Sequence, residues 1–400
     1  MSGPHVKLTP AASKLAVHGQ PWFFRDDLEP VARGLHGRIV RVNSSRGDDL
    51  GLGFYSEVSR LCLRRCGTWV GEGLPTPQSF FAQRLETAWR RRAHLDEEHR
   101  GVRLVHGEGD WLPGLVVDEY DRCLVLQSTS NVVEQNLSVI VPWLRDRVGA
   151  RSVLARNDIP TRRREGLPDE VRLLEGSRVE EVKIRENGIS HVVRLFAGQK
   201  TGFYLDQRPA RRRVTELAKG RRVLDLCGYQ GAFSLAALAG GAREAVVVDQ
   251  SESALELARQ AGEDNGLGPI TTHCADVFDW LREIRSSGEQ FDMVILDPPA
   301  FAKSKREVEN ALRGYRDLNR LAMRALAPDG FLLTCSCSQN VTTQHFETVL
   351  RQAAAGLPFP LILRDRIHAG SDHPMWVAAP ESEYLKVVLL HRVAQAPEPE

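Results

Sequence analysis

The chain has 400 residues, 42% of them apolar, and its 53 basic and 52 acidic side chains give a formal net charge of +1. A chain of this length can bury a large core and is long enough for two or three domains. It contains no apolar stretch near the roughly 20 residues that span a bilayer, and its first residues lack the apolar middle of a secretory signal, so we expect a globular, cytoplasmic protein.

The first 72 residues predict a small all-β domain. Short alternating or β-branched runs at 37–42, 50–55 and 58–65 are separated by turn sequences such as "NSSRGDD". Such closely spaced short strands indicate a compact β-barrel over residues 1–72.

Residues 73–200 predict a linker helix followed by an α+β middle domain. After the interruption "GLPTPQS", residues 79–100 have apolar side chains at helical spacing, with Ser79 as the expected N-cap. The further elements expected here are a helix at 131–147 and strands at 123–129, 171–175, 179–186 and 191–196.

Between residues 201 and 394, short apolar strands alternate with helices. The expected strands are at 221–227, 243–249, 270–276, 291–297, 330–337 and 384–392. The expected helices are at 232–240, 252–264, 277–287 and 307–326. Strict alternation predicts an α/β domain whose parallel sheet is covered by helices on both faces. Residues 395–400 are expected to form a disordered tail.

Arginine outnumbers lysine 45 to 8 and occurs in clusters. The clusters lie at 63–66, 89–94, 161–166, 210–214 and 220–223. Guanidinium groups bind phosphates bidentately, so the clusters are compatible with a nucleic-acid surface. Taken alone, however, they fit solvated helix faces somewhat better.

The seven cysteines are odd in number and scattered, which argues against a disulfide framework and predicts reduced thiols. Cys62 and Cys66 form one C-x3-C pair, but no second pair stands at a plausible distance. We therefore interpret them as buried side chains and expect no metal site.

The residues just after each predicted strand carry most of the functional information, because ligands of such sheets bind beyond the carboxyl ends of the strands. After the first strand, Gly228 and Gly231 let the backbone approach a ligand before a helix begins. The second strand ends at Asp249, 21 residues after Gly228, where an acidic side chain can accept hydrogen bonds from ribose hydroxyls. Together these residues predict a cofactor that contains adenosine.

Two cofactors that contain adenosine are candidates. A dinucleotide fold requires G-x-G-x-x-G against the pyrophosphate, and Leu226 stands where the first glycine is needed. S-adenosylmethionine carries no phosphate, and Asp276 followed by Val277 suits an adenine ring with its amino group. An Asp at a strand end is often only a helix N-cap. Taken together, however, these strand-end residues favour S-adenosylmethionine over a dinucleotide.

The fourth strand ends in "DPPAF" at 297–301. Two prolines remove two backbone donors and stiffen the turn, which fixes Asp297 and the carbonyl groups after it. An acidic residue, two prolines and an aromatic residue are common in methyltransferases that act on exocyclic amino groups of bases. A nitrogen target is therefore open at this point.

The fifth strand, "FLLTCSC", ends at Cys337. Carbon 5 of a pyrimidine is a poor nucleophile, and a thiolate that adds to carbon 6 activates it. Nitrogen methylation needs no such thiol. We therefore interpret Cys337, flanked by Ser336 and Ser338, as a candidate nucleophile and Cys335 as a small buried side chain.

The motifs resemble those of the bacterial 23S ribosomal RNA cytosine-C5 methyltransferases that carry an N-terminal PUA domain. The segments that carry the resemblance are "KTGFYLDQR" (200–208), "DLCGYQGAF" (225–233), "DPPAF" and "TCSCS" (334–338). Those that extend it over nearly the whole chain are "GQPWFF" (19–24), "GEGDWLPGLVVDEYD" (107–121) and "HPMWVAAPESEYLKVVLLHR" (373–392).

The resemblance implies a class I methyltransferase fold with a mostly parallel seven-stranded sheet at 201–394, a PUA-like RNA-binding barrel, and S-adenosylmethionine as donor. It implies Cys337 as the nucleophile, because this residue matches the cysteine of the family's "SCS" motif. The family usually has Phe where this chain has Cys335, which supports a packing role there, and Lys where it has Ala300. The implied partner is 23S ribosomal RNA, naked or in a large-subunit intermediate; a homodimer is compatible with the sequence.

The candidate catalytic residues are Cys337 and Asp297, the latter as a hydrogen-bond partner of the base near N3 or its amino group. The candidate cofactor-binding residues are Tyr204, Asp225, Gly228, Tyr229, Gly231, Asp249, Gln250, Asp276, Val277 and Asp297. In the segment 204–208, the side chains can close over the donor or contact RNA, and Asp206 can instead cap the next helix.

Two other functions stay open from the sequence. One is methylation of a base nitrogen in ribosomal RNA, at an exocyclic amine or at guanine N7, because such enzymes share the two prolines but lack the cysteine. The other is a non-catalytic RNA-binding factor in ribosome assembly that has kept the fold. The base that removes the proton from carbon 5 is not identified, since Ala300 stands where other RNA cytosine methyltransferases can have a second cysteine.

Overall fold

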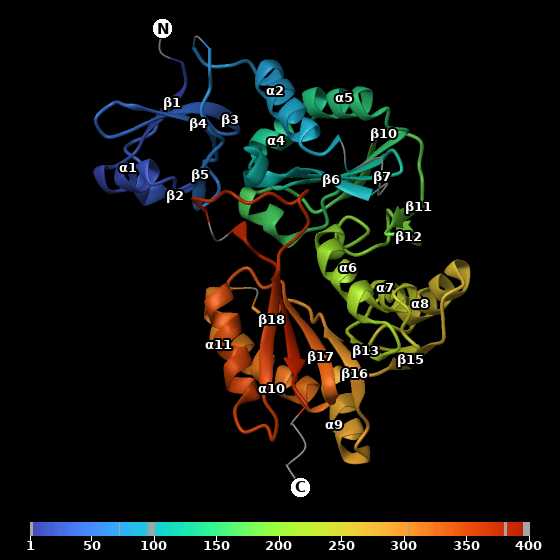
Figure 1. Cartoon of the computed structure of the whole chain (residues 1–400). Coiled ribbons are helices and arrows are strands. Elements are labelled where there is room, and N and C mark those ends of the chain that lie inside the picture. Colours follow the sequence, from blue (N-terminus) through green and yellow to red (C-terminus); the bar gives the residue numbers. More distant parts are fainter. Residues whose placement is uncertain are drawn as a thin grey trace. The chain divides into compact units, whose positions relative to one another are not determined.

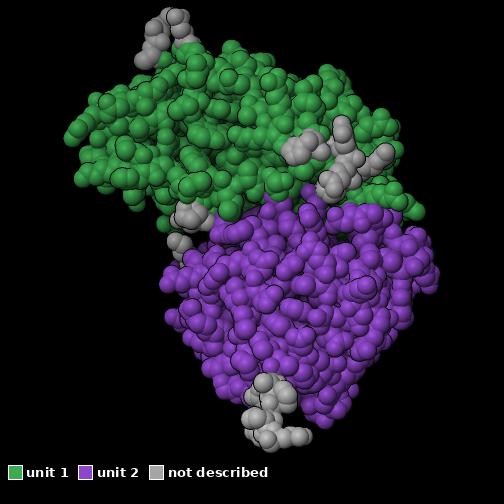
Figure 2. Space-filling model, in the orientation of Figure 1, with its two compact units in different colours: residues 1–186, 192–205, 371–382 green, residues 187–191, 206–370, 383–400 purple. Residues whose placement is uncertain are grey.

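In the computed structural model the chain forms two compact units (Figure 2). Unit 1 comprises residues 1–186, 192–205 and 371–382, and unit 2 comprises residues 187–191, 206–370 and 383–400. The structure describes residues 3–71, 73–93, 95, 101–302, 304–379 and 382–394. The expected tail at 395–400 and the last part of the expected helix at 79–100 therefore lie outside the described residues.

The first sheet of unit 1 contains the three strands that the alternating runs predict. They are β3 (Arg38–Asn43), β4 (Asp49–Tyr55) and β5 (Leu61–Arg65). The additional elements are β1 (His5–Lys7), α1 (Pro10–Val17) and β2 (Trp22–Phe24), and the sheet order is β1-β3-β4-β5-β2. Cys62 and Cys66 are both buried, in two different apolar clusters, as expected for packing residues.

The second sheet of unit 1 has the strand order β10-β9-β8-β7-β6. Its strands are β6 (Gly101–His106), β7 (Leu115–Tyr120), β8 (Cys123–Ser128), β9 (Ser152–Arg156) and β10 (Val171–Gly176). Its helices are α2 (Pro77–Arg90), α4 (Asn131–Gln135) and α5 (Leu137–Val148), and a two-stranded ribbon is formed by β11 (Glu181–Glu186) and β12 (Ile189–Arg194). Short 3-10 turns lie at Arg25–Asp27, Gly107–Asp110, Pro160–Glu165, Leu205–Gln207 and Lys305–Glu307.

Two helix predictions for unit 1 were wrong in detail. The N-cap of α2 is Thr76, whose side chain accepts a hydrogen bond from the Ser79 backbone N–H at 3.2 Å. The helix begins earlier than expected because Pro77 fits its first turn, where no backbone donor is needed. The helix predicted at 131–147 is two helices, because Asn136 departs from helical backbone angles between them.

Unit 2 is built on a seven-stranded sheet in the order β15-β14-β13-β16-β17-β19-β18, as expected for the fold (Figure 1). Its strands are β13 (Arg222–Leu226), β14 (Glu244–Asp249), β15 (Ile270–Cys274), β16 (Phe291–Leu296), β17 (Leu326–Ser336), β18 (Leu361–Ile367) and β19 (Lys386–Arg392). The first five strands are parallel, whereas β19 runs antiparallel to both β17 and β18. The strand order reverses at β13, which is the place where ligands bind in such sheets.

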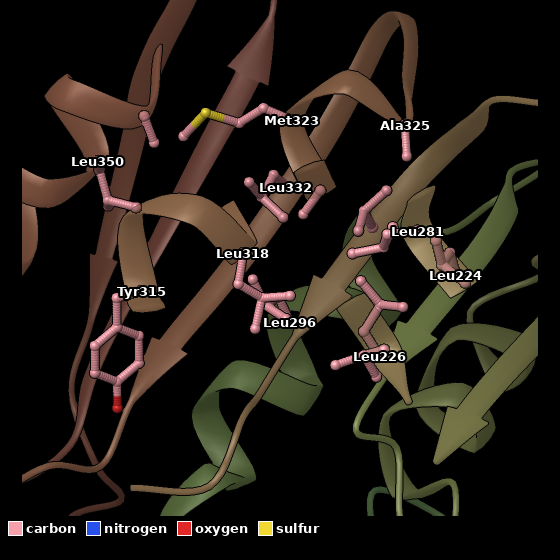
Figure 3. Packing of buried hydrophobic residues seen from close by; sticks show 14 of the residues in the cluster. Leu224, Leu226, Leu281, Leu296, Tyr315, Leu318, Met323, Ala325, Leu332 and Leu350 are labelled. Atoms are coloured by element: carbon pink, nitrogen blue, oxygen red, sulfur yellow. The ribbon is translucent and has the colours of Figure 1, made fainter. Parts of the chain in front are cut away.

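Helices cover both faces of this sheet. They are α6 (Arg208–Leu217), α7 (Ala232–Ala239), α8 (Glu252–Asn265), α9 (Val277–Ser287), α10 (Val308–Arg324) and α11 (Thr343–Ala354). Alternate strand residues face the two sides, so Leu224 and Leu226 of β13 pack with α9 and α10, while Val223 packs with α6 and α7. Figure 3 shows the first of these clusters, in which Leu318 and Met323 of α10 lie over the sheet.

None of the described helices has the length and apolar character needed to cross a bilayer. In the same part of the chain, no group of three or more His, Cys, Asp or Glu side chains is placed to hold a metal ion.

The arginine clusters are divided between the interior and the surface. Arg92, Arg162 and Arg211 are almost completely buried. Arg162, for example, donates to the Glu134 carboxylate at 2.9 Å, whereas its neighbour Arg163 is exposed and paired with Asp169. A run of arginines in this sequence therefore does not by itself indicate a basic surface, because some of its side chains are buried.

Candidate active site

The motifs predicted at strand ends lie along one edge of the unit 2 sheet. Leu226 pairs with both Val248 and Leu296 in the parallel register, and Leu296 pairs in turn with Thr334. The segments that follow β13, β14, β16 and β17 consequently begin at the same level of the sheet. This places the glycine loop, Asp249, the "DPPAF" turn and Cys337 at that edge.

The loop after β13 is tightly packed against the chain itself. A Cβ atom on Gly228 would lie 2.5 Å from Val247 Cγ1, and one on Gly231 would lie 2.9 Å from the Cβ of Ala258. Gly231 also has a φ of +70°, and Cys227, the residue before Gly228, adopts a φ of +60°. Packing against β14 and α8 therefore requires both glycines, and the ligand approach expected from the sequence stays a prediction.

Asp249 connects this loop to the end of β14. Its Oδ2 accepts a hydrogen bond from the Tyr229 backbone N–H at 3.0 Å, and its Oδ1 accepts one from the Ser251 N–H at 2.9 Å. A carboxylate has about four acceptor positions, so both oxygens keep capacity for a ligand. Tyr229 has a φ of +48°, a conformation that non-glycine residues seldom adopt outside sites with a special backbone requirement.

Asp276 and Val277 are accounted for by the start of α9. Asp276 Oδ1 caps the helix by accepting hydrogen bonds from the Phe278 and Asp279 N–H groups. Its Oδ2 accepts from the amide of Gln250 at 2.8 Å, and Val277 packs in the apolar core. Helix capping, which the sequence left open, is thus present, and the contact with adenine stays a prediction.

Asp225 is a fully buried carboxyl group inside β13. Its Oδ2 accepts hydrogen bonds from the Ser234 hydroxyl at 2.7 Å and the Ser234 N–H at 3.1 Å. Its Oδ1 has no hydrogen-bond partner among the described residues. Burial raises the pKa of Asp225 to about 7, and the negative charges of Asp297 and Asp249 add to this increase.

Four carboxylates, three at strand ends and one within β13, act on the same thiol. Burial raises the pKa of the Cys227 thiol, and the charges of four carboxylates raise it further. These are Asp249, Asp297, Asp225 and Asp276. Such a concentration of negative charge disfavours the pyrophosphate of a dinucleotide and suits a cationic ligand. This group of carboxylates therefore fits S-adenosylmethionine, which carries a sulfonium and an ammonium group.

Cys337 and the "DPPAF" turn approach each other at this edge. The Cys337 Sγ lies 4.0 Å from the carbonyl oxygen of Pro298. Ser338 joins the two segments, since its hydroxyl accepts from the Ala302 N–H at 3.3 Å and lies 2.9 Å from the Tyr315 hydroxyl. In Figure 3 the Tyr315 oxygen points away from the other labelled side chains, in keeping with this polar contact.

The two cysteines of the "TCSCS" motif differ in environment. Cys335 is fully buried within β17, and burial together with the charge of Asp297 raises its pKa well above the ordinary value of a thiol. Cys337 comes just after the last residue of β17 and is partly exposed. Of the two, only Cys337 is accessible to a substrate.

The segment 204–208 is divided between the two units. Tyr204 belongs to unit 1, where its hydroxyl donates to Gln199, and its contact with the donor stays a prediction. Asp206 does not cap α6, whose N-cap position is Gln207; instead its Oδ2 accepts from the Tyr384 hydroxyl at 2.7 Å. The Gln207 amide donates to Asp297 Oδ2 at 2.9 Å and thereby orients this carboxylate.

Lys386 is a polar residue at this edge that the sequence analysis missed. Its Nζ donates to the Ser338 carbonyl at 2.8 Å and to the Tyr384 carbonyl at 2.7 Å. The signal was present, because Lys386 is one of only eight lysines and stands in the apolar run "YLKVVLL".

The sequence is similar to those of known methyltransferases. A family model described as S-adenosylmethionine-dependent methyltransferase matches residues 109–379, and one described as PUA-like domain matches residues 6–66. The protein named ribosomal RNA large subunit methyltransferase I from Aeromonas salmonicida is 38% identical over 388 residues, which cover 95% of this chain and 97% of that protein. Its namesake from Photobacterium profundum is 38% identical and covers 92% of this chain and 94% of that protein.

Solved structures share the fold. A protein described as a SAM-dependent methyltransferase from Streptococcus mutans has a TM-score of 0.83 at 24% identity, covering 97% of this chain and 100% of that chain. A methyltransferase crystallised in complex with SAH has a TM-score of 0.84 at 24% identity, covering 98% of this chain and 100% of that chain. At this identity the similarity establishes the fold.

Proposed function

The chain belongs to the S-adenosylmethionine-dependent methyltransferases and, within them, to the family of the ribosomal RNA large subunit methyltransferase I proteins; from this premise we propose that it methylates carbon 5 of one cytosine in 23S ribosomal RNA. The observation that carries the choice of carbon 5 is the partly exposed Cys337 thiol, 4.0 Å from the Pro298 carbonyl of the "DPPAF" turn. A methyltransferase acting on nitrogen has no use for a thiol at this position.

In the proposed site, Asp249 binds the ribose hydroxyls of the donor, and the neighbouring Tyr229, Gln250 and Asp276 line the same edge. When bound, S-adenosylmethionine supplies an electrophilic methyl group. The surrounding carboxylates favour the binding of this positively charged donor over the binding of a neutral or anionic ligand. Both glycines support this arrangement indirectly, by holding the loop against β14 and α8.

Cys337 acts as the nucleophile toward the RNA. Its thiolate adds to carbon 6 of cytosine and forms a sulfur–carbon bond, and the displaced electron pair makes carbon 5 nucleophilic. Asp297, oriented by Gln207, hydrogen-bonds the base near N3 or its amino group. Once carbon 5 carries the methyl group, water takes the proton from carbon 5. The electron pair of that carbon–hydrogen bond re-forms the double bond between carbons 5 and 6, the sulfur–carbon bond breaks, and Cys337 leaves as a thiolate.

The reaction requires the cytosine to be unstacked, because its ring edge is inaccessible within a helix. Recognition of structured RNA relies on shape, phosphates and 2′-hydroxyl groups. The PUA-like segment at 6–66 and exposed arginines of unit 1 such as Arg164 are the surface that we propose for this role. The partner we propose is therefore 23S ribosomal RNA, free or in a large-subunit intermediate.

The product identifies the function directly. We expect 5-methylcytidine when purified enzyme and donor are incubated with ribosomal RNA from a strain that lacks the gene, as measured by nucleoside mass spectrometry with fragmentation. A methyl group on a base nitrogen would replace this proposal by a nitrogen methyltransferase. Donor binding without any methylation, or no donor binding, would favour an assembly factor.

Asp249→Ala is expected to weaken donor binding by about one to two orders of magnitude while the fold persists. The substitution removes the charged acceptor proposed for the ribose, and hydrogen bonds to a charged group contribute roughly 1.5–3 kcal/mol. Calorimetric titration with S-adenosylmethionine measures this loss. Asp264→Ala removes the same charge from an exposed position on α8 and is the matched control. Unchanged affinity in Asp249→Ala removes Asp249 from the site.

A further inference from the structure

Lys386 lies next to the candidate nucleophile on the neighbouring strand. β19 runs antiparallel to β17, and Lys386 pairs with Ser336, the residue before Cys337. Its side chain is buried, with 3% of its surface exposed. Because burying an ammonium group is costly, an apolar residue would serve this position better if packing alone were required.

The amine of Lys386 is held in a fixed position. Its Nζ donates to the carbonyl oxygens of Ser338 and Tyr384, the residues that follow Cys337 and precede β19. An ammonium group has three donors, so one has no acceptor among the described residues. The same backbone segment that carries Cys337 thus also fixes the amine.

The charges of the amine and of the thiol are coupled. Burial lowers the pKa of Lys386 to about 8, while negative charge on Cys337 and on Glu383 raises it. Glu383 is the other charged group that faces this amine in the described part of the chain, and it contacts His368 and Thr343. The coupling acts in both directions, because an ammonium group that gains stability from a thiolate also favours that thiolate.

We propose that Lys386 is a positioning residue whose ammonium group, fixed by the Ser338 and Tyr384 carbonyls, stabilises the thiolate form of Cys337. This inference rests on the proposed function only in assigning Cys337 as the nucleophile. The thiol proton leaves to solvent, the sulfur becomes negative, and the ammonium keeps its protons. A lysine that served only as a donor to two carbonyl groups would leave the reactivity of the thiol unchanged.

Alkylation of the full-length wild-type enzyme by iodoacetamide across a pH series tests the inference without RNA. Mass spectrometry of peptides reports the rate at Cys337, with the exposed Cys274 as an internal reference. We expect the alkylation rate of Cys337 to have its pH midpoint below the ordinary thiol pKa of about 8.5. A Cys337 that titrates at or above this value overturns the inference, even if no variant can be purified.

Lys386→Gln removes the charge but keeps a hydrogen-bond donor. We expect its Cys337 alkylation rate at pH 7 to fall about tenfold and the midpoint to rise by about one pH unit, at the lower end of the effect of a nearby opposite charge. Lys386→Arg, which keeps a charge, should retain most of the wild-type profile, and Lys219→Gln at an exposed position should retain all of it.

A Lys386→Gln profile that superimposes on that of the wild type overturns the inference, whether or not the product is 5-methylcytidine. A different outcome is that the Lys386→Gln profile is shifted from that of the wild type while the wild-type product is methylated on nitrogen. The coupling of Lys386 to Cys337 then stands, and the proposed function fails.

Discussion

Cys337→Ala is expected to abolish methyl transfer, with a loss of at least about four orders of magnitude in rate, while donor binding is unchanged. Removing the nucleophile of a covalent enzyme has effects of this size, because the remaining site can position the substrate but cannot activate it. Since Cys337 is partly exposed and lies just after the end of its strand, the free energy of unfolding should change by less than about 1 kcal/mol. Transfer of labelled methyl groups to ribosomal RNA measures the rate.

Cys335→Ala is the matched control from the same strand. Cys335 is fully buried, so its loss should leave a small cavity and cost about 1–2 kcal/mol of stability while activity survives. The two substitutions are therefore expected to have opposite effects. Normal methylation of cytosine by Cys337→Ala would show that the nucleophile lies elsewhere.

RNA that contains 5-fluorocytidine makes the adduct itself visible. Fluorine cannot leave carbon 5 as a cation, so the sulfur–carbon bond should persist after methyl transfer. Peptide mapping is expected to find the RNA on Cys337 in the wild-type enzyme and in Cys335→Ala, and no adduct in Cys337→Ala. An adduct on Cys335 would contradict the assignment.

The sequence predicted the edge of the sheet where the candidate residues lie. Alternation of strands and helices implies parallel strands, whose carboxyl ends must share one edge, so the sequence alone places Asp249, Asp297 and Cys337 together. The structure has this topology, and four carboxylates, three of them at strand ends, act on one thiol, that of Cys227.

The sequence could not separate roles that the same residue type fills equally well. Gly228 and Gly231 suit a ligand approach, but their Cβ positions are occupied by Val247 and Ala258. Asp276 suits an adenine contact, but it also caps α9. The local sequence pattern shows which residue type a position requires. It does not show which neighbouring residue causes that requirement, because tertiary packing determines the neighbours.

Contacts between distant segments were beyond the sequence for a similar reason. Lys386 reaches the Ser338 carbonyl, one residue after Cys337, only because β19 inserts antiparallel beside β17, a pairing that no local pattern specifies. In the sequence, Arg92 stands out only as part of a basic cluster. Its partners are Asp110 and, 280 residues further along the chain, the backbone of Asp372.

The guanidinium group of Arg92 is the centre of a buried polar network in unit 1. It donates two parallel hydrogen bonds to the Asp110 carboxylate, at 2.9 and 2.7 Å, and others to the carbonyl oxygens of Ala88 and Asp372. Both Arg92 and Asp110 are almost completely excluded from solvent. The network therefore fixes the segment around Asp372, which returns to unit 1 from a remote part of the chain.

Arg92→Ala is expected to lower the free energy of unfolding of unit 1 by about 3–5 kcal/mol, because it leaves the buried Asp110 carboxylate without its charged partner. Arg91→Ala removes a half-exposed arginine that contacts the same carboxylate at 3.2 Å, and should cost at most about 1 kcal/mol. Urea unfolding followed by tryptophan fluorescence reports mainly on unit 1, since six of the seven tryptophans belong to it and only Trp280 belongs to unit 2. Equal midpoints for the two variants would mean that water or a rearranged side chain replaces Arg92, and that the network is not what fixes the Asp372 segment.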